Sequence, residues 1–131
     1  MIRFNKLATI FSFRFWKQSY HLFTSFLVGN VWSQTKLGQI GKGVDINPTV
    51  RFGNYPENIF LGQNISIGYG THIYAGPNSK VTIGDNTMIG PYVFITTEAF
   101  SESKENPEGV HSGHSGDVEI GSNVRIGAHS N

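Results

Sequence analysis

Two histidines in a stretch rich in glycine and serine are candidates for proton transfer. His111 and His114 lie within Gly109-Val-His-Ser-Gly-His-Ser-Gly116, and Glu98 lies at the start of the same polar stretch. The pKa of a histidine is ordinarily close to neutral pH, so its ring can accept a proton from a hydroxyl group. We expect Glu98 to orient such a ring by accepting the proton of its other nitrogen. The alternative is a flexible loop with two solvated histidines.

The remaining three histidines have weaker claims to chemistry. His72 stands between Thr71 and Ile73, which both face inward in a six-residue repeat, so its side chain should face outward. It is either part of a site or an exposed surface residue. His21 is expected to pack within an amphipathic helix or to lie at an interface, and His129 to be structural or to lie at a subunit contact.

A metal site is a third use of these side chains. His72, His111 and His114 supply three nitrogens, the number that a catalytic zinc site requires. Two of the three lie in a soft loop, however, and not on a rigid wall. We therefore predict no metal ligands. Cysteine is absent from the chain, which excludes disulfides and thiol catalysis.

The six-residue repeat must position all of these residues. Large apolar residues recur at every sixth position in four groups: Ile40, Ile46 and Phe52; Leu61, Ile67 and Ile73; Ile83, Ile89 and Ile95; Ile120 and Ile126. This period matches neither a helix nor one long strand, and the Ile-Gly pairs mark short strands that end in turns. The repeat predicts an all-β solenoid over residues 37–131, with one dry interior.

Interruptions of the repeat mark its loops. Short insertions at 53–59 and 75–80 contain proline and glycine, and a long one at 96–117 has almost no apolar residues. We expect the long one to be a structureless loop, which in a compact domain is disordered or functional. The last group stops in mid-repeat, so we expect an incomplete last coil, either of a fragment or covered by another chain.

Residues 1–36 differ from the rest and are expected to form an amphipathic helix. One stripe has a spacing of three and four residues: Phe13, Trp16, Tyr20, Phe23, Leu27 and Val31. Arg14, Lys17 and His21 interrupt every apolar window long enough to span a membrane. The segment is predicted to cap the solenoid, and residues 7–32 are expected to be able to rest on a membrane surface as well. Both roles are compatible.

The charge balance sets limits on partners. Ten Lys and Arg against nine Asp and Glu give a formal net charge of +1, so no single-sign field attracts nucleic acid, and none is predicted as a partner.

The repeats resemble those of the hexapeptide-repeat acyltransferases, and most of all the sugar and polysaccharide O-acetyltransferases. The resemblance covers residues 37–131 and is carried by Ile40-Gly-Lys-Gly-Val-Asp-Ile-Asn-Pro48, Val81-Thr-Ile-Gly-Asp-Asn86, Ile89-Gly-Pro91 and Val118-Glu-Ile-Gly-Ser-Asn-Val-Arg-Ile-Gly-Ala128. It implies a left-handed parallel β-helix, a homotrimer, and acetyl-CoA as co-substrate in a groove between subunits. It also implies a sugar or surface-polysaccharide precursor as acceptor and a cytoplasmic protein, peripheral at the inner face of the cell membrane if the helix rests there.

The resemblance also implies roles for individual residues. A histidine serves as general base. The candidates are His111, His114 and Glu98 for catalysis, His72, Asn64 and Tyr74 for substrate binding, and Gly127 and Ala128 for cofactor binding.

The chain departs from the family in two places. Ile95-Thr-Thr-Glu-Ala-Phe100 lacks the histidine that the family usually has there, and Asn47 stands where serine acetyltransferases have a catalytic histidine, which argues against serine as acceptor. Two further hypotheses follow. One is a degenerate, non-catalytic hexapeptide-repeat protein that only oligomerises, and the second is a zinc enzyme that resembles the γ-class carbonic anhydrases.

Overall fold

A computed structural model describes residues 2–101 and 112–131 of the chain. Helices occupy its N-terminal part: α1 (Ile2–Ile10), α2 (Phe13–Phe26), the π-helical turn η1 (Leu27–Trp32) and α3 (Ser33–Lys36). Short strands and one 3-10 turn follow: β1 (Gln39–Ile40), β2 (Asp45–Ile46), β3 (Arg51–Asn54), η2 (Pro56–Asn58), β4 (Ile59–Leu61), β5 (Ser66–Ile67), β6 (His72–Ala75), β7 (Val81–Ile83), β8 (Met88–Ile89), β9 (Phe94–Thr96), β10 (Glu98–Ser101), β11 (Ser112–Ser115), β12 (Val118–Ile120) and β13 (Arg125–Ile126).

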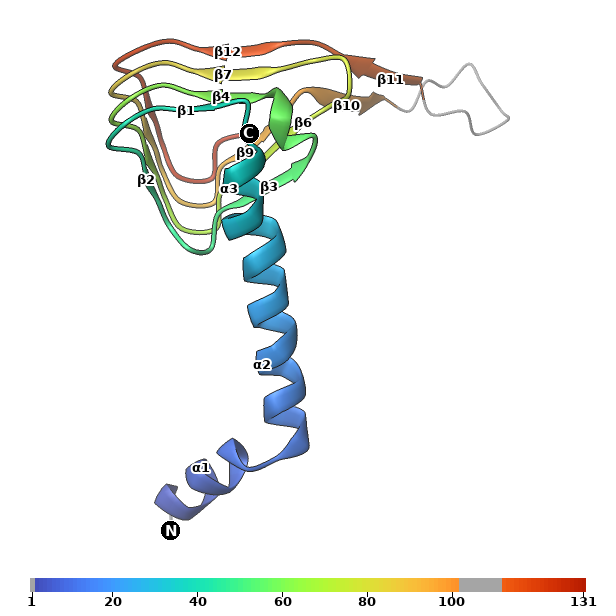
Figure 1. Cartoon of the computed structure of the whole chain (residues 1–131), viewed down its shortest axis with the longest axis vertical. Coiled ribbons are helices and arrows are strands. Elements are labelled where there is room, and N and C mark those ends of the chain that lie inside the picture. Colours follow the sequence, from blue (N-terminus) through green and yellow to red (C-terminus); the bar gives the residue numbers. More distant parts are fainter. Residues whose placement is uncertain (1, 102–111) are drawn as a thin grey trace.

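The strands form three parallel sheets that the chain visits in turn (Figure 1). Their orders are β1-β4-β7-β12, β2-β5-β8-β13 and β3-β6-β9. Residues at the same place in the six-residue repeat pair with one another, for example Ile67 with Ile89 and Ile73 with Ile95. We propose that the three sheets are the walls of the expected solenoid, a left-handed parallel β-helix.

The aliphatic residues of the repeat meet in one core. Its buried members are Val50, Phe52, Ile59, Leu61, Ile65, Ile67, Ile73, Ala75, Val81, Ile83, Ile89, Val93 and Ile95. Thr71 and Thr87 are also fully buried, and their hydroxyls donate to the carbonyl oxygens of Gly90 and Gly121, each at 2.8 Å. These bonds remove the cost of burying a hydroxyl group.

Asparagines set one corner of the coils. Asn64, Asn86 and Asn123 have φ angles of 54°, 57° and 59°, a left-handed conformation that asparagine tolerates. The backbone N–H of Asn64 donates to the carbonyl oxygen of Lys42 in the preceding coil at 2.8 Å, and the Asn64 amide donates to the Asn86 side chain at 3.3 Å. Gly43, with a φ of 70°, occupies the equivalent place in the first coil, where a Cβ would overlap the Asn64 side chain. We name this stack the asparagine ladder.

The stretch expected to be a structureless loop has paired ends. Strands β10 and β11 run antiparallel, with Glu98 opposite Ser115 and Ala99 opposite His114. The base of this hairpin is fixed to the sheets, because Gly116 N–H donates to the carbonyl of Thr97 at 3.0 Å. Backbone hydrogen bonds hold these two strands together, so their sequence does not need the alternation of apolar residues by which a strand is usually recognised. In Figure 1 the hairpin extends away from the three sheets.

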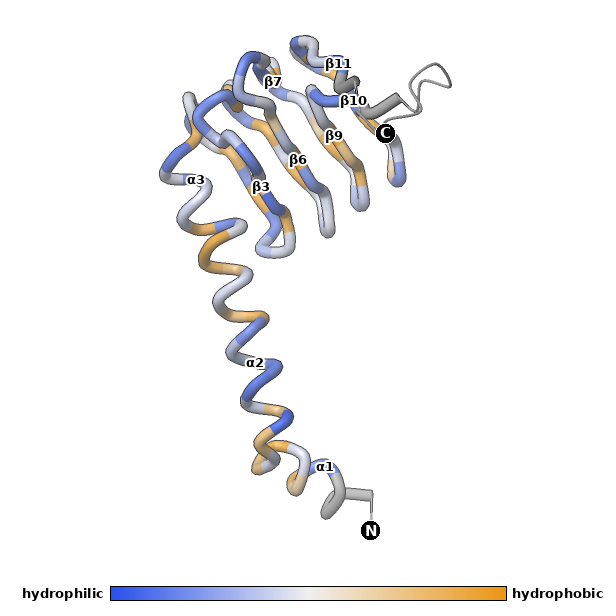
Figure 2. The backbone as a smooth tube through the Cα atoms, turned by 90° about the vertical axis from the view of Figure 1, so that its right-hand side faces the viewer, coloured by the Kyte–Doolittle hydropathy of each residue, from blue (hydrophilic) through white to orange (hydrophobic). Residues whose placement is uncertain are grey.

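The helical segment contacts the sheets only at its C-terminal end, within the described part of the chain. Segments η1 and α3 lie against β3, and Asn30, 4% exposed, donates its amide protons to the carbonyls of Val50 (2.8 Å) and Asn47 (3.2 Å). Helix α2 projects away from the sheets, as Figures 1 and 2 show from two sides, and none of its residues is buried. Among the described residues, no helix is both long enough and apolar enough to cross a bilayer.

Candidate functional site

The outer face of the β3-β6-β9 sheet gathers side chains that can do chemistry. The register places Arg51, His72 and Phe94 side by side in one row, and Gly53, Tyr74 and Thr96 in the next outward row. Residues two apart on a strand share a face, so His72 and Tyr74 both point outward. Thr71 and Ile73, on either side of His72, are fully buried, as the repeat predicts.

Tyr74 holds the His72 ring. The hydroxyl oxygen of Tyr74 lies 3.2 Å from Nδ1 of His72, and the two rings meet edge to face at 5.8 Å. Phe94 packs against Tyr74 as well, with ring centroids 5.6 Å apart. Gly53 makes room for Tyr74, since a Cβ at Gly53 would overlap the tyrosine ring. His72 therefore sits half-buried in a fixed orientation.

The surroundings of His72 favour its neutral form. Partial burial lowers the pKa of His72 from its ordinary value, and the positive charge of Arg51 lowers this pKa further. The imidazole is then unprotonated at neutral pH and can accept a proton. For Nε2 to be the accepting nitrogen, Nδ1 must carry the ring proton and donate it to the Tyr74 oxygen.

The position of Tyr74 leads to a first prediction. Gly53→Ala should push the tyrosine ring off the sheet and lower any activity that depends on His72 by about tenfold, through loss of one orienting hydrogen bond. Steady-state kinetics of the variant measure this loss. Met88→Ala is the control, because Met88 is 49% exposed on a strand of another sheet. Equal activity of the two variants would exclude an orienting role for Tyr74.

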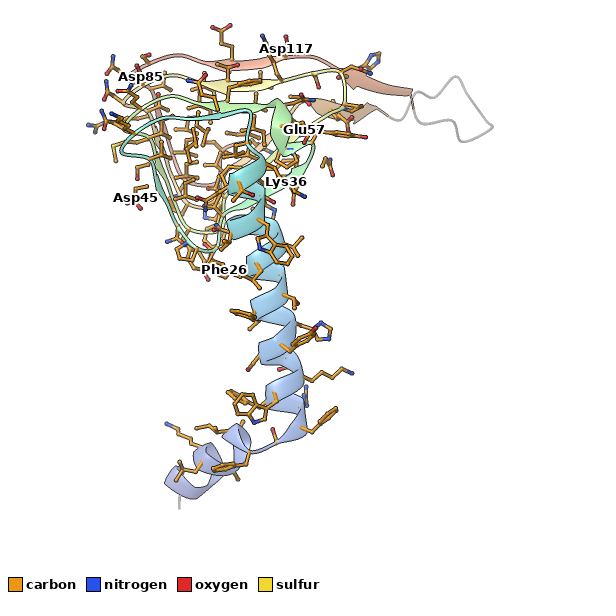
Figure 3. The ribbon with its side chains drawn as sticks, viewed as in Figure 1. Phe26, Lys36, Asp45, Glu57, Asp85 and Asp117 are labelled. Carbon is orange, nitrogen blue, oxygen red and sulfur yellow. The ribbon has the colours of Figure 1, made fainter. Side chains whose placement is uncertain are left out.

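A groove of about 680 Å³ runs beside this face, between the sheet and the end of the helical segment. Arg51, Gly53 and Tyr74 line it from the sheet, and Lys36 and Glu57 line it from α3 and η2. These two elements are in contact, and Figure 3 shows the positions of Lys36 and Glu57 on them. The groove thus offers a polar ligand two positively charged donors, Arg51 and Lys36, and one negatively charged acceptor, Glu57.

The hairpin carries the candidates for catalysis that the sequence suggested. The carboxylate of Glu98 lies against Gly76, just beyond the end of β6. Glu98 itself belongs to β10, after the strand that pairs with β6, whereas Tyr74 is the hydrogen-bond partner of His72. His114 is opposite Ala99, which places its side chain on the hairpin face that Glu98 does not share. His111 lies outside the described residues.

A second hollow, about 500 Å³, lies at the base of the hairpin. Its lining residues come from β9, β10 and β12, among them Phe94, Glu98 and Ile120. It borders the same Phe94 that packs on Tyr74. The two hollows therefore share neighbouring strands, because Tyr74 of the first groove lies on β6 and Phe94 on β9.

The remaining candidates lie elsewhere on the coils. Asn64 belongs to the asparagine ladder at the turn between β4 and β5, a different corner from the face that carries His72. Gly127 and Ala128 are exposed in the turn after β13, beside Gly90. The structure thus brings Tyr74 to His72 and does not bring Asn64 or the Gly127–Ala128 turn to it.

Sequence reasoning missed Arg51 and Tyr92. Arg51 precedes the inward-facing Phe52, so the phase of the repeat could have placed it outward, beside His72. Tyr92 packs edge to face on Tyr69 at 5.5 Å and stacks on His129 at 5.2 Å, which gives His129 a structural role at an exposed corner. No feature of the local sequence marks this stack.

The described part of the chain contains no set of side chains arranged as metal ligands. There, no group of three or more His, Asp or Glu side chains is arranged to hold an ion. His72 lies on the β6 wall and His114 on the hairpin, and the third ligand of the zinc hypothesis, His111, is not among the described residues.

Comparison with known proteins reveals a likeness to an acetyltransferase. The chain is 38% identical over 99 residues to Nodulation protein L of Rhizobium meliloti (strain 1021). The aligned stretch covers 71% of this chain and 45% of that protein. The chain therefore spans less than half the length of this relative. Nodulation protein L is an acetyltransferase of the hexapeptide family, so the likeness supports an acetyltransferase family for this chain. No family model matches the chain, and no solved structure matches it.

Proposed function

We propose that the protein is an O-acetyltransferase that moves an acetyl group from acetyl-CoA to a hydroxyl of a sugar or surface-polysaccharide precursor. The observation that carries this proposal is the 38% identity with an acetyltransferase over 99 residues. This stretch is long enough to take in most of the described sheets. The orientation of His72 adds a chemical reason, since acetyl transfer to a hydroxyl needs a neutral base.

In the proposed reaction, Nε2 of His72 accepts the proton of the sugar hydroxyl. The oxygen then attacks the carbonyl carbon of the thioester, and the resulting tetrahedral intermediate collapses with loss of the coenzyme A thiolate. His72 returns its proton to the departing sulfur, so the base is regenerated and no acyl-enzyme forms. Tyr74 keeps the ring in place through Nδ1, and the groove walls hold the acceptor near the thioester.

The turn at Gly127 and Ala128 is a suitable place for part of the coenzyme. Small residues let backbone N–H groups approach a pantetheine chain closely. Gly127→Val is therefore a variant whose effect should appear in KM for acetyl-CoA more than in kcat.

A homotrimer would complete the site. The hairpin extends away from the sheets of its own chain (Figure 1), which suits a segment that contributes to a neighbour. We propose that His114 reaches the groove of the next subunit and contacts the acceptor there. Cross-linking and sedimentation of the purified chain test the trimer directly.

The charge on Arg51 leads to a prediction about pH. Because the pKa of His72 is lowered, the base form should persist below the ordinary histidine range, and activity should fall only at a more acidic pH. Arg51→Gln removes one of the two causes, so the acidic limb of the kcat/KM profile should move upward toward the ordinary value. Lys42→Gln, an exposed charge change away from the site, should leave the limb in place. An unmoved limb in Arg51→Gln would mean that another group titrates.

The experiment that tests the function is release of free thiol from acetyl-CoA in the presence of sugar acceptors. Thiol release that depends on both substrates supports the proposal. Absence of both thiol release and acetyl-CoA binding would overturn it and favour a non-catalytic protein that only oligomerises. Acetyl transfer to serine would indicate a serine acetyltransferase, and a requirement for zinc would indicate the enzyme that resembles the γ-class carbonic anhydrases.

A further inference from the structure

The N-terminal helices expose a run of large apolar side chains that nothing in the described part of the chain covers. Six of them are between 59% and 83% exposed: Phe11, Phe13, Trp16, Tyr20, Leu22 and Phe23. Few soluble proteins leave a contiguous apolar surface of this kind uncovered, and such surfaces mark interaction sites.

The side chains of α2 divide by type around the helix. At 100° per residue, half of the circumference is apolar except for Ser19: Phe13, Phe15, Trp16, Tyr20, Leu22, Phe23 and Phe26. The opposite arc is polar and carries the basic groups: Arg14, Lys17, Gln18, His21, Thr24 and Ser25. The hydropathy colours of Figure 2 change between orange and blue along this helix, as that division requires.

Charge is distributed just as unevenly along the sequence. Five of the ten Lys and Arg residues fall in residues 1–36, and all nine Asp and Glu residues come later. The helical segment therefore has a formal charge of +5, and residues 37–131 have −4. A partner that covers the apolar face must tolerate this concentration of positive charge, and an anionic partner would be attracted by it.

Helix α2 gains little stability from the rest of the described chain. None of its 14 residues is buried, although it continues into η1 and α3, which contact the sheets. Packing of an apolar face supplies most of the stability of helices in proteins, so a partner on this face would stabilise α2. Among the described residues it is anchored near its C-terminal end, where Arg51 donates to Ser25 and Asn30 bonds the backbone of Val50. Those contacts hold the helix away from the sheets and leave its apolar face free.

We propose that α1 and α2 bind the surface of an anionic lipid bilayer and lie in its interface without crossing it. The apolar half of α2 would enter the boundary between headgroups and acyl chains, where tryptophan and tyrosine are favoured. Arg14 and Lys17 would remain at the level of the phosphates. A second copy of the chain is a less suitable partner for this apolar face. Two paired helical segments, each with a formal charge of +5, would repel one another.

The two tryptophans allow a direct test, since both lie in residues 1–36. Trp32→Phe leaves Trp16 as the single fluorophore of this type, 59% exposed on the apolar face of α2. Adding vesicles of phosphatidylcholine with phosphatidylserine should shift its emission to shorter wavelength, and lipids brominated in the acyl chains should quench it. No shift and no quenching with these vesicles would overturn the proposal.

Charge variants test the anionic requirement. Arg14→Gln with Lys17→Gln should weaken partition onto phosphatidylserine vesicles by roughly 25-fold, at about fivefold for each cation removed. Lys42→Gln with Lys80→Gln makes the same charge change on exposed positions of the coils and should have little effect. Equal effects of the two pairs would contradict a lipid site on α2.

Apolar variants distinguish lipid from a second copy. Trp16→Ser with Phe23→Ser should abolish vesicle binding while the circular dichroism of the sheets is kept, because neither side chain is buried. Met88→Ser, on an exposed strand position, is the matched control. If the Trp16 emission instead shifts with protein concentration in the absence of lipid, a second copy is the occupant and the proposal fails. None of these variants removes a residue of the candidate site, so membrane binding and acetyl transfer fail or succeed separately.

Discussion

His72→Ala is expected to lower the rate of acetyl transfer by about 100- to 10,000-fold, the usual contribution of a general base. The loss should appear in kcat, since the imidazole acts on the proton in the transition state and not on substrate binding. His72 is half-buried and points outward, so the fold should survive its removal. Thiol release from acetyl-CoA with a sugar acceptor is the measurement, and circular dichroism checks the fold.

Further variants give this result its meaning. Tyr74→Phe keeps the ring that packs on Phe94 but loses the hydroxyl near Nδ1, so an intermediate loss of about tenfold is expected. His21→Ala removes an exposed ring on α2, away from the sheet that carries His72, and should be nearly neutral for activity. If His114→Ala or His111→Ala abolishes transfer while His72→Ala does not, the base belongs to the hairpin stretch.

The second large effect concerns stability. Ile73→Ala should lower the free energy of unfolding by about 2–5 kcal/mol, because it opens a cavity in a core where Ile73 is fully buried between Phe52 and Ile95. A loss of this size corresponds to a fall in melting temperature of roughly 10 °C. Thermal or urea denaturation followed by circular dichroism measures it.

An exposed residue of the same coil supplies the control. Tyr69 is 52% exposed, so Tyr69→Ala should change stability by only about 0.5 kcal/mol beyond the loss of its edge contact with Tyr92. If Ile73→Ala proved as mild as Tyr69→Ala, the three sheets would not share the single core that their burial indicates. Activity of Ile73→Ala at low temperature should be reduced as well, since Ile73 lies between the buried Thr71 and Ala75 in the strand segment behind His72.

The sequence predicted those features that depend on the position of a residue within the six-residue repeat. The six-residue repeat aligned Ile67 with Ile89 and Ile73 with Ile95, and the same phase turned His72 outward. In each case the signal lies within a few residues of the feature that it predicts. Asn64, in contrast, was predicted to bind substrate, and the structure places it in a left-handed turn of the asparagine ladder.

Features that depend on contacts between distant residues were not predicted. Arg51 approaches His72 only because two coils pair in register, and the insertion between them hides that register in the sequence. The β10–β11 hairpin is held by backbone bonds in a stretch without apolar alternation, so the sequence there is typical of a loop. The sequence around Asn30 does not indicate that this residue attaches the helices to the sheets. The aromatic stripe was the more obvious candidate for that contact.

The asparagine ladder has a consequence for how the chain can vary in length. Each left-handed turn is hydrogen-bonded to the equivalent turn of the coil before it, from Gly43 through Asn64 and Asn86 to Asn123. The spacing along the ladder is nevertheless not constant, since 21 residues separate Gly43 from Asn64, 22 separate Asn64 from Asn86, and 37 separate Asn86 from Asn123. The extra residues all fall between the β3-β6-β9 sheet and the next strand of the β1-β4-β7-β12 sheet, so that corner accepts insertions. An insertion at the ladder corner would instead move a residue other than glycine or asparagine into the left-handed turn and shift core residues onto the outer face.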